Sequence, residues 1–173
     1  MKTIFYLIFF SLIQISISHS NCDFERLSLG TGSEMIKSVY DTEITKDRDN
    51  YSLSSSSPKG VSGEKVCDDI EFKNLNFRFF FVDHKLHVIS ASDDHDSEVN
   101  YLNSLIGVYG EPTSNRFSQN RVNIIDYHWA LINKDVFLQV IESNDASKTN
   151  IKIISKEYVS LIENSRNSDD VLH

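Results

Sequence analysis

Alternating hydrophobic residues predict a β-hairpin in the middle of the chain. Phe77, Phe79 and Phe81 take every second place in the segment NFRFFFV, which is the period of a β-strand. Phe80 and Val82 lie between them, so both faces of this strand are largely apolar and we expect it inside a sheet. The residues DHK then turn the chain into a second alternating segment, LHVIS.

Two further segments carry apolar residues at the spacing of a helix. The first is SEMIKSVY, whose apolar face consists of Met35, Ile36, Val39 and Tyr40. Thr31 or Ser33 is expected to cap its start. The second is DDHDSEVNYLNSLIGVYGEP, in which acidic residues precede an apolar stripe, and Gly110 and Pro112 follow it. That stripe consists of Val99, Leu102, Leu105, Ile106 and Tyr109.

The pattern of apolar residues in the last third of the chain predicts three strands and a terminal helix. RVNIIDYHWALI alternates, with Ile125, Tyr127 and Trp129 on one face and Asp126 and His128 on the other. The polar residues before this segment are interpreted as a loop. DVFLQVIE and TNIKIIS are the next two strands. The terminal helix is expected to turn three apolar residues inward: Tyr158, Leu161 and Ile162.

The order helix, strands, helix, strands, helix predicts an α+β fold, with an antiparallel sheet and helices on one face. The two main helices open alike, as SEMIKSVY and SEVNYLNSLIGVYG, and strands follow each of them. A tandem α-β-β-β repeat over residues 28–91 and 94–163 is one interpretation. The other interpretation is that one domain contains two unrelated amphipathic helices. In both interpretations the folded domain spans residues 21–163.

Two polar segments are expected outside regular structure. Residues 41–65 hold four consecutive serines, Pro58 and two glycines, and they show neither the helical nor the strand period. We therefore predict a mobile loop there. Residues 164–173 are predicted to form a disordered tail. Asn50 begins a glycosylation sequon, which matters only in a eukaryotic secretory pathway.

The N-terminal residues 1–20 read as a secretory signal peptide. Lys2 precedes an apolar run that is shorter than the roughly 20 residues a transmembrane helix needs. Ser18 and Ser20 supply the small residues that signal peptidase requires, so the mature chain would begin at Asn21. An uncleaved strand or membrane anchor is the disfavoured alternative. The expected location is periplasmic or secreted, with no integral membrane segment after signal removal.

The two cysteines also bear on whether the chain is exported and whether it carries a lipid anchor. A lipoprotein signal would place a small residue before Cys22 and a leucine-like residue at 19, whereas the chain has Asn21 and His19. Lipidation is therefore disfavoured. Since Cys67 is the only other cysteine, an exported chain favours a Cys22–Cys67 disulfide. Its loop of roughly 45 residues would stabilise the fold by about 4 kcal/mol if the bond is unstrained.

Charge narrows the range of partners. The chain carries a formal net charge of −8, and removal of the signal peptide, which takes away one lysine and no acid, changes it to −9. A chain this acidic will not bind nucleic acid or anionic lipid by charge alone. A basic protein partner, or none, is the inference that the charge supports.

Three phrases carry a resemblance at the level of the fold: LSLGTGSEMIKSVY, FFVDHKLHVIS and LNSLIGVYGEP. They resemble the helix and hairpin signatures of small exported bacterial proteins of the SmpA/OmlA outer-membrane lipoprotein and β-lactamase-inhibitor-protein type. The resemblance covers about a third of the chain and implies modules that pair helices with an antiparallel sheet. It implies no site residue, and the lipoprotein cysteine signature is missing here.

Common catalytic, zinc, redox and nucleotide-binding motifs are absent from the sequence, so we expect neither an enzyme nor a cofactor or metal. The acidic cluster before the second helix could contact a partner or serve only to stabilise the helix start: Asp93, Asp94, His95, Asp96 and Glu98. Asp126 and His128 share one strand face, where the carboxylate could orient the imidazole. A solvent-facing polar stripe is the favoured explanation of this pair.

Three functions are compatible with these features. The first is an exported protein-binding module, such as an inhibitor or an immunity protein against a basic, envelope-directed protein. The second is an assembly or structural factor of the envelope. The third is a hydrolase with a noncanonical site around Asp126 and His128. A pocket that unites these two residues with a hydroxyl would favour the third.

Overall fold

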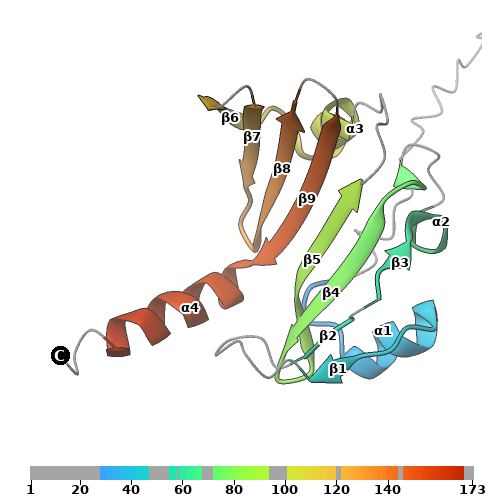
Figure 1. The fold of residues 1–173 in the computed structure, drawn as a ribbon. Helices are drawn as coiled ribbons and strands as arrows, with labels where there is room; N and C mark the ends of the chain where they lie inside the picture. Colours follow the sequence, from blue (N-terminus) through green and yellow to red (C-terminus); the bar gives the residue numbers. More distant parts are fainter. Residues whose placement is uncertain are drawn as a thin grey trace, which may run out of the picture.

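A computed structural model describes the part of the chain that carries the fold, namely residues 28–46, 55–57, 59–67, 72–93, 101–119, 122–143 and 146–169. The predicted signal peptide, Cys22 and Asn50 lie outside these residues. The described strands form one antiparallel sheet in the order β1-β2-β4-β5-β9-β8-β7-β6, with β3 also paired to β4 (Figure 1). The predicted α+β class with an antiparallel sheet is confirmed.

The long strands are β4 (Asn76–Val82), β5 (Lys85–Asp93), β6 (Thr113–Gln119), β7 (Val122–Ala130), β8 (Lys134–Glu142) and β9 (Ser147–Ser155). The short strands are β1 (Thr45–Lys46), β2 (Ser55–Ser56) and β3 (Val61–Ser62). The helices are α1 (Ser33–Tyr40), α2 (Gly63–Val66), α3 (Tyr101–Tyr109) and α4 (Lys156–Asp169). No described helix is long and apolar enough to cross a membrane.

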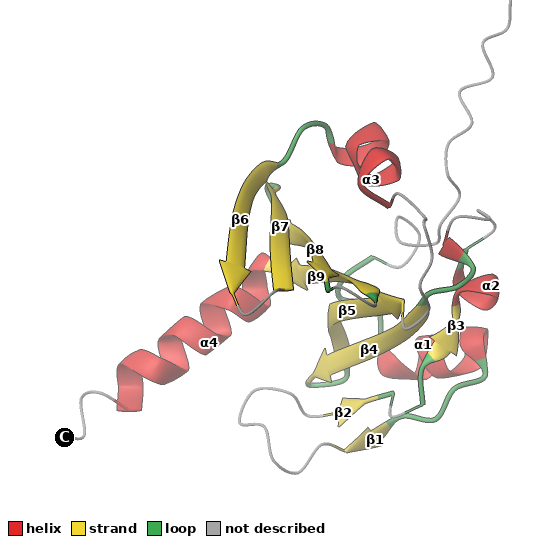
Figure 2. Ribbon diagram, turned by 45° about the horizontal axis from the view of Figure 1, so that its top comes forward, coloured by secondary structure: helices red, strands yellow, loops and turns green. Residues whose placement is uncertain are grey.

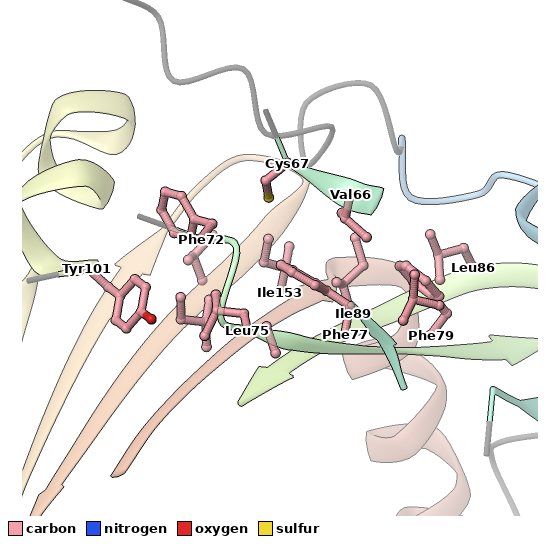
Figure 3. Packing of buried hydrophobic residues seen from close by; sticks show 14 of the residues in the cluster. Val66, Cys67, Phe72, Leu75, Phe77, Phe79, Leu86, Ile89, Tyr101 and Ile153 are labelled. Atoms are coloured by element: carbon pink, nitrogen blue, oxygen red, sulfur yellow. The ribbon is translucent and has the colours of Figure 1, made fainter. Parts of the chain in front are cut away.

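The core lies between one face of the sheet and the helices α1, α2 and α3. The alternating phenylalanines of β4 are fully buried there: Phe77, Phe79 and Phe81. Tyr40 of α1 stacks on Phe79 with 5.5 Å between ring centroids, and Val66 of α2 belongs to the same cluster. Figure 3 shows Phe77 and Phe79 in this layer, with Tyr101 of α3 at its far end. Three helices therefore share one face of the sheet.

The β4–β5 hairpin is confirmed, and its turn follows from the sequence. Asp83 and His84 have positive φ angles of 47° and 64°, the left-handed conformation that two-residue hairpin turns require and that Asp and His tolerate better than most residues. The register shifts between Phe80 and Phe81, which leaves His87 as the additional residue on β5. His87 is buried, and its Nδ1 lies 2.8 Å from the Ser155 Oγ.

Helix α1 differs from its prediction at two points. Gly32 occupies the N-cap position, and no side chain caps the helix. Ile36 and Tyr40 are buried as expected, but Met35 and Val39 are 63% and 61% exposed. The buried residues of α1, which are Ser33, Ile36 and Tyr40, form a single line along the helix, so only part of its apolar face is covered.

The predicted mobile loop 41–65 contains short strands. Ser57 is buried, donates its backbone N–H to the Phe79 carbonyl oxygen at 3.0 Å, and accepts the Phe79 N–H on its hydroxyl at 3.0 Å. β2 and β3 both pair with β4. Residues 55–57 and 61–65 thus have ordered backbone contacts, because strand pairing and a serine hydroxyl hold them without an apolar period, and the mobility of the loop stays a prediction.

Strand β6 was also predicted as a loop. It pairs with β7 over its whole length, from Thr113 opposite His128 to Gln119 opposite Val122. The side chains from Thr113 to Ser118 are all exposed, so no burial pattern marks the strand in the sequence. Backbone pairing with β7 forms it, and the Thr113 hydroxyl adds a hydrogen bond to the His128 carbonyl oxygen.

Helix α4 extends the chain away from the sheet, as Figure 1 shows. It continues to Asp169 and so includes residues 164–169 of the predicted disordered tail. It contacts β5 and β9, where the buried Tyr158 packs beside His87 and donates its backbone N–H to the Ser155 hydroxyl. The two predicted repeats also differ: among the described residues, three two-residue strands and α2 lie between α1 and the β4–β5 hairpin, whereas α3 is followed by four long strands with no such elements between.

Candidate functional site

The candidate site is the side of β6–β9 that points away from the core, called the open face here. Ile125 and Trp129 of β7 point into the core side and are buried. Because successive side chains of a strand point to opposite faces, Asp126 and His128 lie on the open face. The predicted assignment of these four residues to two faces is confirmed.

Strand register aligns the open-face side chains in rows across four strands. The upper row consists of Thr113, His128, Phe137 and Lys152. The middle row consists of Asn115, Asp126, Gln139 and Asn150. These two rows line a hollow of about 490 Å³. Side chains rich in hydrogen-bonding groups therefore surround one exposed concavity.

A third row beside the hollow is apolar on three strands. Phe117, Ile124 and Ile141 occupy it, followed by Lys148 on β9. Phe117 is 56% exposed, and Ile124 and Ile141 are partly exposed. An apolar strip next to a polar hollow is the composition of many protein-binding surfaces.

Asp126 and His128 do not form the dyad considered from the sequence. The Asp126 Oδ1 accepts a hydrogen bond from the Gln139 Nε2 at 2.9 Å. The His128 Nε2 lies 2.9 Å from the Asp135 Oδ1 instead. This pair could not be predicted from the sequence, because the hairpin register of β7 and β8 alone brings Asp135 beside His128.

Asp135 joins the open face to helix α4. Its carboxylate, which is buried, accepts hydrogen bonds from the Lys156 Nζ at 2.7 Å and 2.6 Å. Burial alone would raise the pKa of Asp135, but the hydrogen bonds and charges of Lys156 and His128 outweigh it and hold the pKa below its ordinary value. The His128 ring stacks on Phe137 with 4.5 Å between centroids. His128 is thereby fixed at the rim of the hollow.

The predicted acidic contact cluster is described only at its first residue. Asp93 is 2% exposed, and its Oδ2 accepts a hydrogen bond from the Tyr101 hydroxyl at 2.8 Å. Asp93 is therefore not available as the partner contact considered from the sequence: its carboxylate ties β5 to the start of α3. Asp94, His95, Asp96 and Glu98 lie outside the described residues.

Cys67 is buried beside α2, as Figure 3 shows, and the described residues include no free cysteine. Since Cys22 lies outside them, its pairing with Cys67 stays a prediction. No group of three His, Cys, Asp or Glu side chains in the described part of the chain could hold a metal ion.

Comparisons with models of known families, with curated proteins and with solved structures found no match to this chain. The resemblance to exported lipoproteins and inhibitor proteins therefore stays a prediction. What the structure defines is a class: an α+β domain with one sheet face in the core and an exposed face that carries a lined hollow.

Proposed function

We propose that this chain is an exported protein-binding module that holds a basic partner protein on its open face. The observation that carries the proposal is the hollow, in which Gln139 holds the half-buried Asp126 carboxylate within the middle row. A lysine or arginine side chain of the partner could enter there and meet the carboxylate together with the amides of Asn115 and Asn150.

The surroundings of the hollow support a protein partner. The apolar strip of Phe117, Ile124 and Ile141 would be covered by the same partner, which supplies the hydrophobic part of binding. The net charge of −8 would speed the encounter with a basic protein. An inhibitor or immunity protein acting on an envelope-directed protein fits this arrangement, and an envelope assembly factor is the alternative within the same class.

The partner contact can be tested with a matched pair of variants. Asp126→Asn removes the charge from the hollow, and Glu163→Gln removes the same charge from the exposed surface of α4. We expect the wild type and Glu163→Gln to capture a common basic protein from the exported fraction. Asp126→Asn should bind that protein at least roughly tenfold more weakly, because a charge-assisted hydrogen bond is lost. Equal affinity of the two variants would place the contact elsewhere.

Export itself is proposed from the sequence, and intact mass tests it. The secreted protein should begin at Asn21, weigh two hydrogens less than the reduced chain, and carry no lipid. Cys67→Ser should then lower the free energy of unfolding by about 2–4 kcal/mol. A mass increment of lipid size, or an uncleaved N-terminus, would contradict this proposal.

One observation favours a hydrolase as a second candidate. The hollow unites Asp126 and His128 with the hydroxyl of Thr113. That hydroxyl, however, donates to the His128 backbone carbonyl oxygen at 3.2 Å, and the imidazole is directed to Asp135. Hydrolysis of a panel of activated esters, abolished by His128→Gln with the fold intact, would establish this alternative.

A further inference from the structure

Strand β6 forms one end of the sheet, and no described strand pairs with its outer edge, as Figure 2 shows. It runs for seven residues in continuous register with β7. Regular edge strands expose backbone N–H and C=O groups that can pair with another chain. Ser114 and Ser118 have small side chains, and Arg116 is the only charged residue of the strand.

The hydrogen-bonding groups that point outward can be identified from the neighbouring strands. The Leu131 N–H donates to the Lys134 carbonyl oxygen at 3.0 Å, so this pair, which closes the β7–β8 turn, is hydrogen-bonded. Hydrogen-bonded pairs recur at every second residue of an antiparallel ladder. The odd-numbered residues of β7 therefore bond to β8, and the even-numbered residues, including Asp126 and His128, bond to β6.

The same alternation assigns the groups of β6. Asn115, opposite Asp126, and Thr113, opposite His128, bond to β7. The Thr113 hydroxyl donates to the His128 carbonyl oxygen, which independently places that carbonyl on the β6 side. It follows that the backbone groups of Ser114, Arg116 and Ser118 point away from the sheet.

We propose that two copies of this chain associate through β6, in antiparallel register with Phe117 facing Phe117 of the partner subunit. Arg116 then faces Ser118 of the partner subunit, and the two residues exchange both of their outward backbone hydrogen bonds. The Phe117 side chains meet at a pair that is not hydrogen-bonded, where facing side chains are closest and aromatic pairs are favourable.

Side-chain chemistry selects this register over its neighbour. A shift that centres the two-fold axis on Arg116 would place two guanidinium groups directly opposite each other, which is destabilising. In the proposed register the apolar strip of one subunit, from Ile141 through Ile124 to Phe117, continues into the strip of the other. The 56% exposure of Phe117 is then explained by its place at a subunit boundary.

This self-association through β6 is separate from the proposed binding of a basic partner protein and does not depend on it. Because the contact is short and each copy carries a net charge of −8, we expect a weak dimer that salt strengthens by screening the repulsion between the copies. A dimer would also place the hollows of both subunits on one continuous sheet face.

Sedimentation velocity over a concentration series, at low and high salt, tests the proposal. Arg116→Pro deletes one outward N–H without touching the bonds to β7, and edge strands tolerate proline at such positions. Arg116→Ala keeps that N–H and removes the charge. We expect the wild type and Arg116→Ala to dimerise, and Arg116→Pro to weaken dimerisation by roughly tenfold or more. Phe117→Ala should weaken it as well.

Two results would overturn the proposal. One is a wild-type chain that stays monomeric up to millimolar concentration in high salt. The other is a dimer of unchanged strength in both Arg116→Pro and Phe117→Ala. Unchanged melting temperature and circular dichroism of Arg116→Pro show that the variant folds, and a Phe117→Ser variant repeats the test if it does not. Capture of the basic partner by a monomeric variant separates this proposal from the proposed function.

Discussion

Replacement of Phe79 by alanine is expected to lower the free energy of unfolding by about 3–5 kcal/mol. Phe79 is fully buried at the centre of β4, and Tyr40 of α1 stacks on it. The substitution would leave a cavity lined by residues of a strand and a helix that cannot both relax into it. Urea unfolding, followed by circular dichroism, measures the loss.

Phe117→Ala is the matched control, because it removes the same side chain from the exposed end of the sheet. At concentrations low enough to keep the chain monomeric, we expect a change within about 0.5 kcal/mol. A similar loss for the two variants would mean that the core is not organised around the β4 phenylalanines.

Replacement of Asp135 by alanine is expected to destabilise the fold by about 2–3 kcal/mol at neutral pH. The variant leaves the Lys156 and His128 groups without their shared carboxylate. Both of these side chains reach solvent, so water takes over part of the lost interaction. Loss of this contact should also free the start of α4, which a rise in amide exchange near Lys156 would show.

The pH dependence of stability separates Asp135 from His87. The pKa of Asp135 is held below its ordinary value, so its contribution is complete above about pH 4 and is lost as pH falls through the folded pKa. Burial lowers the pKa of His87, partly opposed by Glu157 and Asp83. Stability should therefore start to fall below about pH 6.5, where His87 of the unfolded chain takes up a proton first.

Variants assign the two steps. Asp135→Asn should remove the step below about pH 4 and keep the one that starts near pH 6.5, whereas His87→Gln should do the opposite. Unfolding free energies over this pH range, measured with urea, provide the comparison. A single step that survives in both variants would contradict the assignment.

Prediction from the sequence worked where burial is periodic. The spacing of Phe77, Phe79 and Phe81 predicts β4. The pattern of β7 correctly places Trp129 in the core and Asp126 on the open face. It failed for β6, where every described side chain is exposed and only the backbone specifies the strand. The helical pattern also predicted burial of Met35 and Val39, which are exposed. Helical spacing shows which residues share a face, but it does not show how wide the covered part of that face is.

The site was predictable only in part, because the alternation of a strand shows which residues share a face but not which residues of other elements lie beside them. Asp126 and His128 share a face by alternation, which the sequence shows directly. Asp135 reaches His128 only through the register of a hairpin, and Lys156 reaches Asp135 only through the path of β9 into α4. Asp93 belongs to an acidic run in the sequence, yet it is buried, and its carboxylate accepts a hydrogen bond from the Tyr101 hydroxyl.

The open face of β6–β9 is the surface that we propose binds a partner protein. The most direct measurement is amide and side-chain NMR of the labelled chain, recorded before and after addition of the basic protein captured by the wild type. We expect the largest shift changes on the hollow and its strip: Asn115, Phe117, Asp126, Gln139 and Asn150. Changes confined to α1 or α4, with these residues unaffected, would contradict it.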